Sequence, residues 1–121
     1  MTTILVVDDE WELTEIAAYV LETAGFEVLE AHNASAALEL LARRHVDLVV
    51  TDVMMPGMDG VELAEEIHRQ RRLAATKILA VSAAPEYLVL TKDHFFDAFL
   101  AKPFSAGALL EQVSYLLEGP K

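Results

Sequence analysis

Several polar residues share one feature: each stands at, or directly after, the carboxyl end of a short apolar run. They are Asp8, Asp9, Asp52, Ser82 and Lys102. Clustered carboxylates without histidine or cysteine are hard oxygen ligands, which suit Mg²⁺. A lysine would add a positive charge to such a cluster, and a serine would add a hydrogen-bond donor. Together these groups predict a site that handles a phosphoryl group.

The three aspartates need a cation if they converge. Two carboxylates about 4 Å apart repel by roughly 4 kcal/mol at an effective dielectric constant near 20. Asp8, Asp9 and Asp52 could therefore stay ionised together only beside a cation; otherwise one of them protonates. A carboxylate such as Asp52 can also act as a nucleophile and form an acyl phosphate.

Apolar runs rich in valine and isoleucine alternate with helical patterns, which predicts strand–helix units repeated along the chain. The predicted strands cover 4–7, 26–31, 46–52, 77–82 and 98–102. The predicted helices cover 12–24, 34–44, 60–70, roughly 85–93, and a last segment between Ser105 and Gly119. Because several strands lack polar alternation, we expect a parallel sheet with helices on both faces. Ligands bind beyond the carboxyl ends of such strands, where the polar residues would meet.

Helix boundaries have their own signals. Gly25 is expected to end the first helix, while Asn33 and Ser105 are expected to cap the second and the last. A helical repeat predicts one buried stripe on the first helix, made of Ile16, Ala17, Val20, Leu21 and Ala24.

Composition excludes several classes of protein. The chain has 121 residues, a length that suits one domain, and we expect residues 1–121 to form it. A net charge of −11 disfavours direct binding to nucleic acid or an anionic membrane. There is no cysteine, no signal peptide pattern and no apolar run of membrane-spanning length. A cytoplasmic protein is the expectation.

The combination of motifs resembles the receiver domains of two-component response regulators. The resemblance rests on Asp8-Asp9 after the first strand, Asp52 in TDVMMPGMDG, Ser82-Ala83 and Lys102-Pro103. It covers the whole chain. It implies a flavodoxin-like, three-layer (βα)5 fold with strand order 2-1-3-4-5, an order known for a chemotaxis receiver.

The resemblance also implies roles for these residues. Asp52 would accept a phosphoryl group from a histidine kinase or a histidine phosphotransfer protein. Mg²⁺, with Mn²⁺ as a substitute, would be held by Asp9, Asp52 and the backbone carbonyl of Met54. Asp8 would act through water. Such a protein is not an enzyme beyond its own phosphorylation and dephosphorylation.

The same resemblance implies a switch. Lys102 would pair with a phosphoryl oxygen, and its peptide bond to Pro103 would be cis. Ser82 would move toward the phosphoryl group, and Phe99 would turn into the space that Ser82 leaves. The output surface would be the fourth helix, fifth strand and last helix, through which a homodimer could form. Pro56, Met58, Asp59 and Gly60 would shape the loop and start the third helix.

Some alternatives remain open. An aspartyl-phosphate hydrolase would usually carry an acid two residues after its nucleophile, where this chain has Met54. A flavin carrier would need a Ser-, Thr- and Gly-rich loop after the first strand, where this chain has acids. The chain is either a complete regulator or the receiver of a longer protein, with Met1 arguing against the end of a hybrid kinase. The output partner and the cognate kinase are not predicted.

Other residues have simpler interpretations. Trp11 is expected to be a partly exposed first-turn residue, with a kinase contact as the alternative. The four histidines, His32, His45, His68 and His94, share no ligand spacing and are expected on the solvated surface. The segment Tyr87–Leu90 is too apolar for one buried stripe, so an output or dimer face and an irregular packed loop are equally expected.

Overall fold

The computed structural model describes residues 1–55, 57–83 and 95–118 and contains one five-stranded sheet. All strand pairs are parallel, and the order is β2-β1-β3-β4-β5, as predicted. The strands are β1 (Thr3–Val7), β2 (Glu27–Ala31), β3 (Leu48–Asp52), β4 (Lys77–Ser82) and β5 (Ala98–Ala101). The helices are α1 (Trp11–Thr23), α2 (Ala34–Arg43), α3 (Gly60–Arg69) and α5 (Ala106–Glu118), with a 3-10 turn η1 (Arg71–Leu73).

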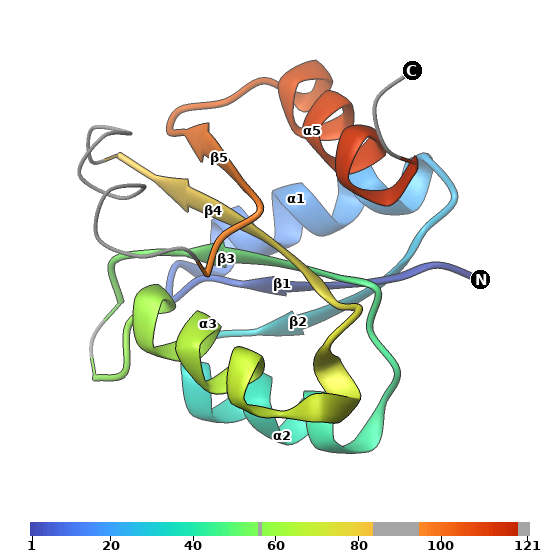
Figure 1. Cartoon of the computed structure of the whole chain (residues 1–121). Coiled ribbons are helices and arrows are strands. Elements are labelled where there is room, and N and C mark those ends of the chain that lie inside the picture. Colours follow the sequence, from blue (N-terminus) through green and yellow to red (C-terminus); the bar gives the residue numbers. More distant parts are fainter. Residues whose placement is uncertain (56, 84–94, 119–121) are drawn as a thin grey trace.

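Helices cover both faces of the sheet, with α1 and α5 on one side and α2 and α3 on the other (Figure 1). Successive strand residues point to opposite faces. In β1, therefore, Ile4 packs with the core under α1 and α5, and Leu5 packs with the core under α2 and α3. Both are completely buried. This two-sided burial explains why the strand sequences are apolar at consecutive positions rather than alternating.

Local capping signals predicted the helix ends well. Asn33 Oδ1 accepts a hydrogen bond from Ala36 N at 2.7 Å, and Ser105 Oγ accepts one from Ala108 N at 3.0 Å. Gly25, just after α1, has a φ of 98°, the left-handed conformation expected there. The predicted fourth helix, together with Gly119 and Pro120, lies outside the described residues.

The buried face of α1 differs from the predicted stripe. Ile16 is 59% exposed and Ala24 is also exposed, while Thr14, Ala17, Ala18 and Leu21 are buried. Thr14 can be buried because its hydroxyl donates to Trp11 O at 2.8 Å. The prediction that Ile16 is buried was wrong, because apolar character alone does not determine which face of a helix packs on the sheet.

Asp47 connects two strands at the amino-terminal edge of the sheet. Its Oδ2 accepts a hydrogen bond from Thr3 N at 2.9 Å, and its Oδ1 lies 3.0 Å from His45 Nε2. The bond from Thr3 lowers the pKa of the Asp47 carboxyl; burial opposes this shift and His45 adds to it. Asp47 therefore joins the start of β1 to the segment before β3.

Replacing Asp47 with alanine is expected to lower the free energy of unfolding by about 1 kcal/mol at neutral pH, because Thr3 N loses its acceptor. A lowered pKa gives stability that is present above the unfolded-state pKa of about 3.9. That stability is lost as the pH falls through the lower folded-state pKa. Urea unfolding of wild type and variant, from neutral pH down to about pH 3, should show their difference shrinking at the acid end.

Asp47→Asn is the matched control, because an amide oxygen can accept the Thr3 hydrogen bond without titrating. The free energy of unfolding of Asp47→Asn is expected to differ from that of wild type only because the negative charge is lost. If the loss of unfolding free energy in Asp47→Ala stayed constant as the pH fell to about 3, the stabilising role of the ionised carboxylate would be contradicted.

Candidate functional site

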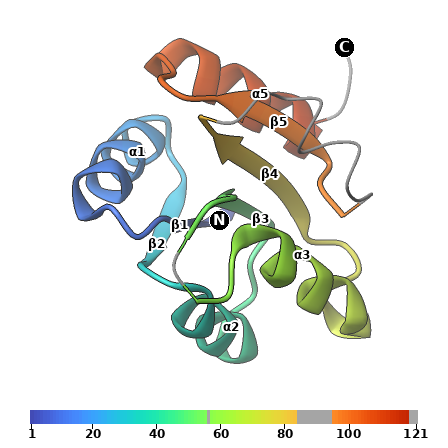
Figure 2. The same cartoon turned by 90° about the vertical axis from the view of Figure 1, so that its left-hand side faces the viewer.

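The carboxyl ends of β1 and β3 bring three acids together at one edge of the sheet. Figure 2 looks onto that edge. Asp8 and Asp9 follow β1, Asp52 ends β3, and each offers a carboxylate oxygen within 4.8 Å of the other two. Asp8 and Asp52 are buried, at 5% and 7% exposed, whereas Asp9 is exposed. The sequence-predicted convergence of these three side chains is therefore what the fold produces.

Lys102 places its ammonium group between the two buried acids. Its Nζ lies 2.9 Å from Asp8 Oδ2 and 3.5 Å from Asp52 Oδ2. Lys102 follows β5 directly, and its backbone N donates to Ser82 O at 2.9 Å, which ties the lysine to the end of β4. The Lys102–Pro103 peptide bond is cis, as expected. The lysine therefore points back across the sheet edge toward β1 and β3.

The pKa values of this group differ from ordinary ones. Burial raises the pKa of the Asp52 carboxyl; Lys102 opposes the rise and Asp8 adds to it. Burial also works against the charged form of Lys102, but the hydrogen bond to Asp8 and the two carboxylate charges outweigh it and raise the lysine pKa. Lys102 is thus firmly protonated at neutral pH. Additional positive charge nearby would stabilise the ionised form of Asp52.

The donor set fits Mg²⁺ or another hard divalent cation. Three carboxylates converge without any histidine or cysteine among them, and one of them, Asp9, is open to solvent. Among the described residues, Lys102 is the cation paired with these acids, and it supplies one positive charge to three carboxylates. The remaining negative charge, together with the raised pKa of Asp52, gives a bound cation a clear electrostatic advantage.

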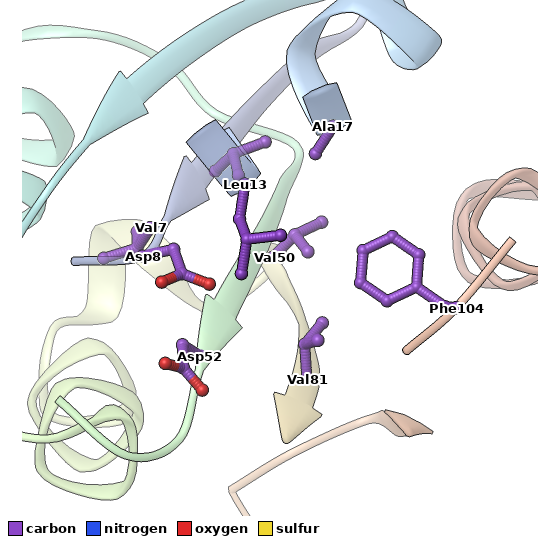
Figure 3. A pocket seen from close by; sticks show the side chains of 9 residues that line it. Val7, Asp8, Leu13, Ala17, Val50, Asp52, Val81 and Phe104 are labelled. Atoms are coloured by element: carbon purple, nitrogen blue, oxygen red, sulfur yellow. The ribbon is translucent and has the colours of Figure 1, made fainter. Parts of the chain in front are cut away.

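A small apolar cavity lies behind the buried carboxylates. It has a volume of about 20 Å³, and its lining includes Asp8, Asp52, Leu13, Val50 and Phe104 (Figure 3). The walls other than the two acids are hydrocarbon, which explains the desolvation of Asp52. One side of the carboxylate pair therefore faces an apolar wall, and reagents approach from the solvent side of the sheet edge.

The start of α3 is held tightly by capping and by the end of β3; Pro56, also expected to shape this loop, lies outside the described residues. Asp59 Oδ1 accepts a hydrogen bond from Glu62 N at 2.9 Å, and Glu62 Oε1 accepts one from Asp59 N at 3.3 Å, which forms a capping box. Gly60 N donates to Val53 O at 2.9 Å. A Cβ atom on Gly60 would overlap the backbone oxygen of Asp52 and lie 2.8 Å from Val53 Cα. The first residue of α3 therefore rests directly on the backbone of Asp52.

Ser82 and Phe99 occupy neighbouring strands close to this edge. Ser82 ends β4 and is completely buried. Phe99, in β5, is partly buried and packs with Phe96 and Val61 against Val53 and Ala80. Ala80 and Phe99 are register partners in the sheet. This arrangement places the two residues expected to form the switch on paired strands.

Trp11 and His32 form a contact that the sequence did not predict. Their rings stack with centroids 3.5 Å apart, and His32 Nε2 lies 3.1 Å from Thr14 Oγ1. Trp11 is 64% exposed, as expected, but His32 is partly buried rather than solvated. No sequence signal separates His32 from the exposed His45 and His68, because its partner lies in another element; His94 is outside the described residues.

Comparison with known protein families and sequences gives a consistent result. A family model for the response regulator receiver domain matches residues 4–114. The chain is 35% identical over 117 residues to the phosphate regulon transcriptional regulatory protein PhoB of Pseudomonas aeruginosa, covering 95% of this chain and 51% of that protein. It is 32% identical over 114 residues to the alkaline phosphatase synthesis transcriptional regulatory protein PhoP of Bacillus subtilis. This match covers 94% of this chain and 48% of that protein.

Solved structures agree with the sequence matches. The response regulator TrrA of Thermotoga maritima, in complex with Mg²⁺ and BeF, has a TM-score of 0.87 at 34% identity, covering 97% of this chain and 100% of that chain. The chemotaxis protein CheY4 of Vibrio cholerae has a TM-score of 0.89 at 29% identity, covering 97% of this chain and 99% of that chain.

The fold and the acidic edge are those of a phosphoryl-accepting signalling domain. The chain belongs to the response regulator receiver family of two-component systems. It spans about half the length of the curated relatives it matches. None of the helices in the described ranges has the length and hydropathy needed to cross a membrane.

Proposed function

We propose that Asp52 is the phosphoryl acceptor and that residues 1–121 act as a single receiver domain. The observation that supports Asp52 most strongly is its position beside a partly buried, protonated Lys102, with Nζ 3.5 Å from Oδ2. A nucleophilic carboxylate and a fixed cation for the incoming phosphoryl oxygens then lie side by side. In-line attack by an Asp52 oxygen on phosphorus forms the acyl phosphate and expels the donor group.

We further propose that Asp9, Asp52 and the backbone carbonyl of Met54 hold Mg²⁺ directly, with Asp8 acting through water and Mn²⁺ as a substitute ion. When bound, the ion would neutralise charge on the phosphoryl oxygens. Asp8 already holds Lys102 at 2.9 Å, so its main task in this proposal is to orient that lysine. Exposure of Asp9 leaves one side of the cluster open to the ion.

The switch proposal assigns Ser82 and Phe99 to signal transmission. Ser82 would hydrogen-bond the phosphoryl group, and Phe99 would follow it inward from the partly buried cluster with Val53 and Ala80. Because Phe99 is only partly buried, inward movement would bury more of its apolar surface. The output surface in this proposal comprises the segment between Ser82 and Phe95, β5 and α5, and includes a homodimer contact.

The proposed partners are a histidine kinase or histidine phosphotransfer protein upstream and an output domain or protein downstream. We propose a cytoplasmic location, no direct contact with nucleic acid or membrane, and no enzymatic activity beyond self-phosphorylation and self-dephosphorylation. The net charge of −11 supports the exclusion of polyanionic partners for the surface as a whole.

Incubation with acetyl phosphate and Mg²⁺, followed by intact-mass measurement, tests the core of this proposal. One phosphoryl group per chain is expected with Mg²⁺, and none with excess chelator. Equal modification in both samples would refute the metal-dependent mechanism, and the absence of modification with metal would count against acceptance of phosphate at this site.

The lifetime of the acyl phosphate should depend on the residue two positions after Asp52. Met54 is 68% exposed and cannot orient a water for in-line attack; Ala84, its counterpart by the family's geometry, lies outside the described residues. Self-dephosphorylation therefore lacks the water positioning that polar side chains supply. We expect Met54→Asn with Ala84→Glu to lose phosphate at least about threefold faster than wild type after donor removal.

Phosphate loss is followed by mass or by release of inorganic phosphate. Exposed Met58 provides the control: Met58→Asn makes the same chemical change as Met54→Asn but lies four residues further along the loop, so its phosphate lifetime should match wild type. A double variant that keeps its phosphate as long as wild type, or longer, would show that these two positions do not set the lifetime.

A further inference from the structure

In the part of this acidic protein that the structure describes, positive charge is concentrated at one end. Apart from Lys102, every lysine and arginine in the described ranges lies at the end of α2 or α3, in η1 or at the start of β4. These segments lie at the edge of the sheet opposite the acidic site (Figure 1). These residues are Arg43, Arg44, Arg69, Arg71, Arg72 and Lys77. With a net charge of −11, such segregation makes this end locally unlike the rest of the surface.

Three of these arginines line a hollow between the end of α2 and η1. The hollow has a volume of about 250 Å³, and its charged lining consists of Arg43, Arg44 and Arg72, with His45 and Thr76 beside them. No Asp or Glu is among the described residues that line it. A concave surface with several guanidinium groups and no lining carboxylate is suited to an anion with more than one negative oxygen.

The walls of the hollow are held by bonds between distant segments. Arg72 Nη1 donates to Leu41 O at 2.6 Å, which places a guanidinium on a carbonyl at the end of α2. Thr76 Oγ1 donates to Val46 O at 2.9 Å, and both residues also line the hollow. Arg72 is exposed, but its guanidinium is tied to Leu41 O and, through Nη2, to Gln70 Oε1 at 2.7 Å, so part of the hollow is already organised before any ligand arrives.

The arginines keep donors available for a ligand. Arg43 pairs with Glu39 at 2.9 Å, where both side chains are more than half exposed, and Arg44 pairs with Glu27 at 2.7 Å. Each pair uses one terminal nitrogen of a group that has five N–H donors. Exposed ion pairs of this kind are weak, so their acids do not cancel the capacity of the hollow for anions.

Helix dipoles explain only part of this arrangement. Cations near helix C-termini are favourable, and this accounts for Arg43 and for Arg69, each paired with a glutamate four residues earlier. It does not account for arginines from α2, the following loop and η1 facing one hollow.

We propose that this hollow binds a small oligophosphate, either free or carried on a nucleoside, through Arg43, Arg44 and Arg72. The volume suits a compact group with two phosphates better than an extended macromolecular surface. The ligand would lie at the opposite edge of the sheet from Asp52, so the two sites are separate. The proposal does not depend on the phosphoryl-acceptor role of Asp52.

The test is a titration of the ¹⁵N-labelled chain with inorganic pyrophosphate in the presence of a chelator, which keeps metal out of the acidic site. Ionic strength is held constant with chloride. We expect saturable shifts of amides in 41–46 and 72–76 and none near Asp8, Asp9 or Asp52. A parallel titration with ADP shows whether the phosphates alone are recognised or whether the nucleoside adds affinity; comparable or tighter ADP binding at the same amides supports the proposal.

The variant Arg43→Gln with Arg44→Gln should weaken pyrophosphate binding at least about tenfold, because two charge-assisted sets of hydrogen bonds are lost. Arg72 is left in place since it also caps α2. The matched control, Arg69→Gln with Arg71→Gln, removes the same charge from the same end without touching the lining, and should change affinity less than about threefold. Equal weakening in the two double variants, shifts near Asp52 instead, or no saturation with pyrophosphate would overturn the proposal.

Discussion

Replacing Asp52 with asparagine is expected to abolish phosphorylation by acetyl phosphate. An amide is a poor nucleophile and carries no charge to share with a cation, so both proposed functions of the side chain are lost. The measurement is intact mass after incubation with acetyl phosphate and Mg²⁺. Asparagine and aspartate have nearly the same volume, so the comparison isolates chemistry from packing.

The fold of this variant can be checked independently. The pKa of Asp52 is raised by burial, so the ionised carboxylate opposes folding at neutral pH and only the protonated form, at low pH, is free of that cost. Asp52→Asn should therefore raise Tm in metal-free buffer, by about 3 °C if roughly 1 kcal/mol is recovered. Glu15→Gln, on the exposed side of α1, removes the same charge elsewhere and should still be phosphorylated. Full phosphorylation of Asp52→Asn would refute the assignment of the acceptor.

Gly60→Ala is expected to disrupt the site strongly, because a Cβ at this position has less room than at any other described glycine. The new methyl group would meet the backbone oxygen of Asp52 and lie 2.8 Å from Val53 Cα, and neither is a flexible side chain. Either α3 or the end of β3 must shift. Overpacking of this kind costs about 1–3 kcal/mol. Displacement of Asp52 from Lys102 should also slow phosphorylation at least about tenfold, since the rate depends on their alignment.

Gly107→Ala is the matched control, because it makes the same chemical change near the start of α5. The nearest atom to its new Cβ would be Ser105 Oγ at 3.9 Å, so nothing clashes. It should be neutral or raise the unfolding free energy by up to about 1 kcal/mol through helix propensity. Urea unfolding and the rate of mass gain are compared for both variants. If Gly60→Ala matched Gly107→Ala in stability and rate, close packing of α3 on Asp52 would be irrelevant to the site.

The sequence alone determined the kind of elements and the edge where the polar residues meet. Consecutive apolar residues in 4–7 and 48–50 favour burial on both faces, and their alternation with helical patterns is typical of a helix-covered parallel sheet. Once strands are parallel, the acids after β1 and β3 and the lysine after β5 must share one edge. Caps such as Asn33 and Ser105 were predictable because each acts on a backbone group three residues away.

Only the tertiary structure decided which faces and which atoms meet. Sequence could place Lys102 and Asp8 at one edge, but their 2.9 Å contact joins residues 94 apart in the chain, so it depends on how the sheet from β1 to β5 packs. The same holds for Gly60 against Asp52 and for Arg72 on Leu41 O, which bring separate elements together. The exposure of Ile16 has the same cause. A helical repeat defines the spacing of residues along one face, but the elements that pack against the helix determine which face is buried.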